Sequence, residues 1–154
     1  STILNRPNFA AESCITRGKI VSPTTSSVIF NEGWWDQEVY GRWMKGNAAE
    51  FEINLPNNHT GSRTNRYALT VQGDFFMGRT QPISFMIDGE EMGTLEDTGD
   101  GVLTALFTTR RPANTVTINL KLSDQTVQSP KALGLSADER TLTFFLKAAH
   151  LTSA

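Results

Sequence analysis

The residues best suited to chemistry lie between Gly33 and Trp43, a stretch that carries all three tryptophans and one of the two tyrosines. Aromatic faces bind sugar rings by stacking, and they also fill the cores of small β-domains. Asp36, Glu38 and Arg42 lie among them and could hydrogen-bond sugar hydroxyls. The stretch therefore suggests a carbohydrate-binding site, with a core-filling role as the alternative.

Trp34 and Trp35 are adjacent, and successive side chains of an extended segment point to opposite faces. At least one of the two should therefore be exposed or lie under a loop. We expect the ligand-binding residues to be Trp35, Trp34, Glu38, Arg42 and Tyr40. The alternative places Trp43 and Tyr40 in the core, with one of the paired tryptophans capping an open end of the fold.

No catalytic signature accompanies this cluster. The chain has no nucleophile elbow and no phosphate-binding glycine loop. Its two histidines, His59 and His150, have no acidic partner at metal spacing. Cys14 is the only cysteine, which excludes an internal disulfide and a cysteine-based zinc site. We therefore expect a domain that is not itself an enzyme.

Residues 96–101 form an acidic, glycine-rich segment, expected to be a loop, that contains Glu96, Asp97 and Asp100. Its oxygens could hold calcium, but the spacing does not match the alternating ligands of a helix-loop-helix site. An ordinary solvated hairpin loop is the interpretation we favour. We expect no cofactor.

Composition excludes several partners. The formal net charge is −2 and 19% of residues are charged, so there is no basic surface for nucleic acid. Apolar runs are only a few residues long, far short of the roughly 20 that insert into a bilayer. The chain starts at Ser1 without a methionine, from which we expect an excised or processed part of a longer protein.

Outside these candidate site residues, the main pattern of the chain is an alternation of apolar and polar residues with a period of two, which is typical of β-strands. It marks segments 51–55, 67–71, 116–122 and 142–146, with a shorter candidate at 28–30 and a hairpin at 83–95 that turns at Asp88-Gly89. Helical periodicity of useful length is absent. We predict an all-β, two-sheet antiparallel β-sandwich, of the jelly-roll or galactose-binding-like type. Residues 1–154 should form one domain, with 1–18 a loosely patterned N-terminal segment.

Two stretches together resemble a known group of domains. One runs from Gly33-Trp34 through Glu38-Val39-Tyr40-Gly41-Arg42-Trp43 to Gly46, and the other is Ser129-Pro130-Lys131-Ala132-Leu133-Gly134-Leu135-Ser136-Ala137-Asp138-Glu139-Arg140-Thr141-Leu142. With a strand ending in Asp-Gly between them, they resemble the β-sandwich domains appended to bacterial envelope-polysaccharide enzymes. These enzymes include membrane phosphoglycerol transferases and some glycosyltransferases. The similarity covers roughly residues 28–151.

The resemblance implies a non-catalytic accessory domain on the outer, periplasmic side of a bacterial inner membrane. Its partners would be a glycan and a catalytic domain of the same polypeptide, which could be a transferase. A docking module without sugar affinity is the alternative. Tyr40 occupies a position where the pattern more often has tryptophan. Trp35 is not part of the pattern, so it is the stronger candidate for ligand binding by this particular chain.

The second stretch also has a structural interpretation. Ser129-Pro130 should fix a turn, Leu133 and Leu135 should pin a short helical turn to the sandwich, and Gly134 should allow the reversal. Asp138 and Arg140 should tie the loop by hydrogen bonds or an ion pair.

Overall fold

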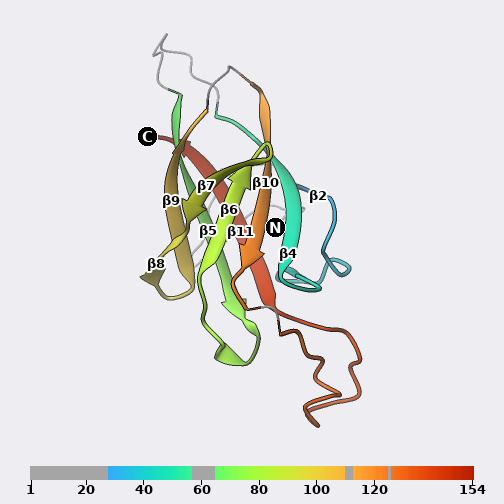
Figure 1. Ribbon diagram of the computed structural model, residues 1–154. Helices are drawn as coiled ribbons and strands as arrows, with labels where there is room; N and C mark the ends of the chain where they lie inside the picture. Colours follow the sequence, from blue (N-terminus) through green and yellow to red (C-terminus); the bar gives the residue numbers. More distant parts are fainter. Residues whose placement is uncertain (1–27, 57–64, 110–112, 125) are drawn as a thin grey trace.

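Two antiparallel sheets make up the described part of the chain. The computed structural model describes residues 28–56, 65–109, 113–124 and 126–154, which contain ten strands and one short 3-10 helix, η1 (Phe76–Gly78) (Figure 1). The N-terminal segment 1–18, Cys14 and His59 lie outside the described residues. In spatial order, the first sheet contains β2 (Val28–Phe30), β4 (Ala48–Asn54), β10 (Thr115–Leu122), β6 (Ile83–Ile87) and β7 (Glu90–Thr94). The second contains β3 (Arg42–Trp43), β11 (Phe144–Ser153), β5 (Arg66–Phe75), β9 (Val102–Thr108) and β8 (Glu96–Gly99).

This architecture confirms the predicted all-β sandwich. Among the described strands, consecutive strands share a sheet only at β6–β7 and at β8–β9, and the chain crosses to the other sheet at each of the other connections. Strands far apart in sequence pair as a result: β4 with β10, and β5 with β11. Repeated crossing of this kind is typical of jelly rolls.

The period-two segments form the core as predicted. In the first sheet Ile118 lies opposite Phe51 on one side and Ile87 on the other, and all three are buried. In the second sheet Val71 and Leu69 lie opposite Ala149 and Leu151. Their inward faces meet in one hydrophobic cluster, as expected when two half-buried sheets pack face to face.

Three strands, β3, β8 and β9, were not predicted from the sequence, each for a different physical reason. β8 has no apolar residue and all four of its residues are exposed, while β3 is only two residues long. In β9 the exposed Leu106 breaks the alternation around the buried Leu103 and Phe107. Both β3 and β8 lie at sheet edges, where pairing on one side is enough to hold a short strand.

Loops from both sheets gather at one end of the sandwich, the lower end in Figure 1. They are the loop before β3, η1 after β5, and the long connection between β10 and β11. Trp43 packs edge-on against Phe76 with ring centroids 6.0 Å apart, and Arg79 donates to the Gln128 side chain at 2.7 Å. These contacts join η1 and the segment after it to β3 and to the β10–β11 connection. No helix in the described ranges has the length and apolar character needed to cross a bilayer.

Candidate functional site

Trp34 is part of the core. It is only 6% exposed, and its indole N–H donates to the Glu50 carbonyl at 2.7 Å. Its ring packs edge-on against Phe30 and Phe51. Gly33, at φ +96°, allows the close approach, because a Cβ there would meet the Ala49 Cα at 2.7 Å. This arrangement leaves little of Trp34 accessible to a ligand.

Trp35 points the other way and is partly exposed, as alternation predicted. Its indole N–H donates to the Thr141 carbonyl at 2.7 Å, and its backbone N–H donates to the Trp43 carbonyl at 2.9 Å. The ammonium group of Lys45 lies 4.6 Å from the ring centroid, a cation–π geometry. Trp35 is therefore a partly open aromatic side chain held in one orientation.

Glu38 lies next to a charged pair from the other end of the chain. Arg140 donates to Glu38 at 3.1 Å and to Asp138 at 2.8 Å. The hydrogen bonds that Arg140 donates lower the pKa of Asp138 to about 2, and the same bonds, to Asp138 and Glu38, raise the pKa of Arg140. The predicted Asp138–Arg140 tie is confirmed. Sequence reasoning missed its extension to Glu38, because nothing local relates residues 102 positions apart.

Arg42 supports Trp35 instead of facing an open surface. Its Nε donates to the Trp35 carbonyl at 2.5 Å, and its guanidinium lies 4.7 Å from the Phe30 ring centroid. Burial lowers the pKa of Arg42, and the charge of Asp36 opposes that shift. The side chain therefore fixes the backbone from which Trp35 projects.

Tyr40 is 80% exposed and its neighbour Val39 is 85% exposed, at the tip of the loop before β3. The loop is closed by the Glu38 N–H, which donates to the Gly41 carbonyl at 2.9 Å, and by the Gln37 side-chain amide, which donates to the same carbonyl. The alternative that placed Tyr40 in the core is wrong, because this tight turn carries its side chain away from both sheets.

Trp43 is half-buried on the outer face of the second sheet. It lies opposite Phe145 in register, while the inward positions are taken by Met44, Phe144 and Leu146. Its ring packs against Phe145 at 4.9 Å and against Phe76. The alternative that placed Trp43 in the core is wrong, since the pleat directs its side chain outward.

The connection between β10 and β11 folds largely as its residues predicted. The Ser129 hydroxyl accepts from the Ala132 N–H at 3.0 Å, and Gly134 adopts φ +73° while donating to the Lys131 carbonyl. Leu133 is half-buried, but Leu135 is 55% exposed. The expected anchoring by Leu135 is therefore wrong, because the reversal at Gly134 turns it to the surface.

The acidic loop forms a hairpin between β8 and β9. Asp97 Oδ1 accepts from the Gly99 N–H at 2.8 Å, and the Thr98 hydroxyl donates to the Val102 carbonyl at 2.9 Å. Glu96 and Asp100 are exposed. Within the described ranges, no three His, Cys, Asp or Glu side chains lie close enough to hold a metal ion.

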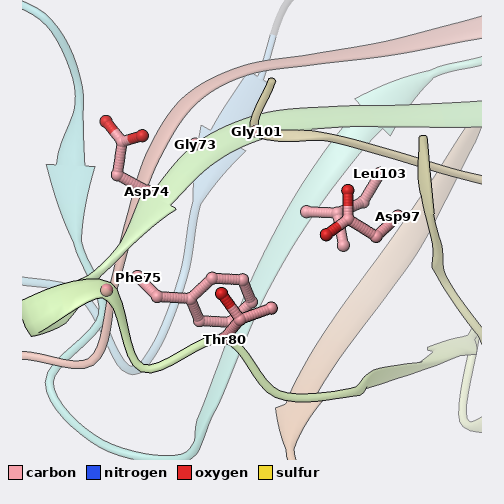
Figure 2. Close-up of a pocket in the computed structure, with 8 residues that line it drawn as sticks. Gly73, Asp74, Phe75, Thr80, Asp97, Gly101 and Leu103 are labelled. Carbon is pink, nitrogen blue, oxygen red and sulfur yellow. The ribbon is translucent and has the colours of Figure 1, made fainter. Parts of the chain in front are cut away.

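One hollow of about 210 Å³ lies beside this hairpin (Figure 2). The walls come from the end of β5, η1 and the segment after it, and the β8–β9 hairpin. It is lined by Gly73, Asp74, Phe75, Gly78, Thr80, Asp97, Gly101 and Leu103. Of these residues, Asp97 and Gly101 belong to the acidic loop that the sequence indicates, whereas the others come from separate segments with no shared motif.

Comparison with known proteins gives remote structural matches only. No family model matches the chain, and no curated protein matches it. The CBM36-1 domain of a multidomain xylanase from the hindgut metagenome of Trinervitermes trinervoides is 13% identical, with a TM-score of 0.44 over 84% of this chain and 98% of that one. A family 35 carbohydrate-binding module from Clostridium thermocellum is 11% identical, with a TM-score of 0.41 over 82% of this chain and 88% of that one. These values are too low to assign a ligand to this chain.

Proposed function

We propose that this chain is a non-catalytic carbohydrate-binding domain that holds a glycan against Trp35. The observation that carries the proposal is the indole of Trp35, which is partly open and fixed by the Thr141 carbonyl. A ring already held in its bound orientation loses little conformational entropy on binding. Sugar C–H groups would pack against it, as they do on other aromatic platforms.

Charged side chains beside Trp35 could form hydrogen bonds with the hydroxyl groups of a bound sugar. Glu38 accepts hydrogen bonds and Arg140 donates them, and both remain partly exposed while paired at 3.1 Å. Lys45 lies over the indole as an exposed, flexible side chain that can move aside and donate to a hydroxyl. Trp34 and Arg42 contribute by fixing the backbone around Trp35. Tyr40 offers a second aromatic surface at the loop tip.

The biological setting that we propose follows from the resemblance of residues 28–151 to domains of envelope-polysaccharide enzymes. The domain would position a bacterial cell-envelope glycan for a catalytic domain of the same polypeptide, a transferase. That activity would place it on the periplasmic side of the inner membrane.

Substitution of Trp35 tests the proposal. In Trp35→Ala we expect at least a tenfold loss of affinity for envelope oligosaccharides, because the stacking surface is gone. Trp35→Phe keeps an aromatic face and should retain part of the affinity. Isothermal titration calorimetry would measure both, with thermal unfolding as the check on folding. Glycan binding that is equal in Trp35→Ala and the wild type would contradict the proposed site.

A docking module is the second candidate, and the exposed Val39–Tyr40 tip favours it. Apolar side chains on a tightly closed turn can insert into a partner's surface. Replacing both residues by serine would then weaken assembly with the catalytic domain in the full-length protein. Intact assembly, together with sugar affinity that depends on Trp35, would contradict this candidate.

A further inference from the structure

The hollow beside the β8–β9 hairpin is separate from the Trp35 loop, since none of the loop residues lines it. Its volume of about 210 Å³ falls below the range of roughly 300–1,000 Å³ that suits drug-sized ligands. It therefore fits one small polar unit, such as a single sugar residue or one of its substituents.

The walls of the hollow combine an aromatic ring with hydrogen-bond acceptors. Figure 2 shows the Phe75 ring with Thr80 beside it, and Asp97 across from them. The Phe75 ring packs edge-on against the buried Phe144 ring, with ring centroids 5.0 Å apart. Among the described residues, the Thr80 hydroxyl has no hydrogen bond, and Asp97 accepts one, at Oδ1 from the Gly99 N–H. The remaining lone pairs are available to a donor.

Charge around the hollow is negative. Asp74 points away from the ring in Figure 2 and pairs with Lys147 at 2.6 Å. Arg79, which precedes Thr80 in the sequence, donates to the Gln128 side chain. Asp97 forms no ion pair with any described residue and has Glu96 and Asp100 as sequence neighbours. A cation would therefore meet an unneutralised carboxylate and an aromatic ring, and both attract it.

We infer that the hollow binds the protonated primary amine of an amino sugar in the glycan. The ammonium group would donate to Asp97 and Thr80 beside the Phe75 ring. This inference rests on the proposed function for the kind of ligand, but it uses different residues. It predicts a preference for glycans with free amino groups over their N-acetylated forms, which are neutral.

Calorimetry with glucosamine oligomers and N-acetylglucosamine oligomers of equal length tests the inference. At pH 5, acidic enough to protonate the amines of the glucosamine oligomer, we expect that oligomer to bind at least tenfold more tightly. Added salt should reduce that preference, because the contact with Asp97 is ionic.

Asp97→Asn should abolish the preference, since it removes the charge but keeps the oxygen that accepts from Gly99. Asp100→Asn is the matched control: it removes an equal charge from the same hairpin without altering the lining of the hollow. A preference lost equally in both variants would indicate general electrostatic attraction and would overturn the inference. Thermal unfolding of both variants checks that the hairpin still folds.

The outcomes separate this inference from the proposed function. If both oligomers bind equally and both lose affinity in Trp35→Ala, the hollow is not an amine site and the proposed function stands. If Asp97→Asn abolishes the free-amine preference while Trp35→Ala leaves the affinity for both oligomers unchanged, the hollow binds the amine and the proposed Trp35 site is wrong. If neither oligomer binds, the inference is overturned.

Discussion

At the scale of single residues, the direction of a side chain separates two adjacent tryptophans. Trp34 and Trp35 have the same chemistry, yet one indole N–H reaches the Glu50 carbonyl in the core and the other reaches Thr141 at the end of the sandwich. Alternation along the chain requires that divergence. Which of the two faces inward depends on β4, against which Trp34 packs.

Trp34→Ala should destabilise the domain by about 3–5 kcal/mol, because it leaves a large cavity and removes one of the two hydrogen bonds that the Glu50 carbonyl accepts. Urea unfolding would measure the change. Tyr40→Ala is the aromatic control, since that side chain is 80% exposed, and it should change stability by no more than about 0.5 kcal/mol. Similar losses in the two variants would contradict the burial assigned to each residue.

At the scale of elements, an ion-paired clasp joins two loops. We define the clasp as Glu38, Asp138 and Arg140, which connect the loop before β3 to the segment between β10 and β11. The same two loops also meet at the Trp35–Thr141 hydrogen bond. The clasp therefore helps to hold Trp35 in position even though it does not touch the ring.

Because of the clasp, the free energy of unfolding should fall as the pH is lowered from about 4 to 2. The pKa of Asp138 is lowered from 3.8 to about 2 in the folded state, so its contribution is complete above about pH 4 and is lost as the pH falls toward 2. The Tm of Asp138→Asn should therefore lie below that of the wild type at neutral pH. The difference should shrink between about pH 4 and pH 2.

Glu139→Gln is the control for this pH dependence. Within the described part of the chain Glu139 pairs only with Lys131, and both side chains are mostly exposed, so its loss should barely change Tm at any pH. Differential scanning fluorimetry across the pH series would compare the three proteins. A Tm difference for Asp138→Asn that stays constant down to pH 2 would contradict the clasp.

At the scale of the whole molecule, pairing between distant strands sets the folding rate. β5 pairs with β11 and β4 with β10, so the central contacts close long loops before they gain stability. We expect refolding in milliseconds to seconds, as for other all-β sandwiches. Stopped-flow measurement of tryptophan fluorescence would test this, since Trp34 becomes buried on folding. A microsecond relaxation would contradict it.

The sequence by itself determined the sandwich, because alternation of buried and exposed side chains is a local property of each strand. Segments such as 116–122 and 67–71 carry that period plainly, and both lie in the core sheets. The same local rule separated Trp34 from Trp35, and short spacing linked Asp138 to Arg140. Strands without the pattern, such as β8, could not be recognised.

Only the tertiary structure decided what surrounds the candidate sites. The Glu38–Arg140 ion pair joins residues 102 positions apart, and the hollow takes Phe75, Thr80 and Asp97 from separate segments. Tyr40 and Trp43 likewise point outward because of a turn and a strand pairing that their neighbours in sequence do not specify. Local periodicity fixes which face of a strand is buried, whereas packing between strands distant in sequence fixes which side chains meet.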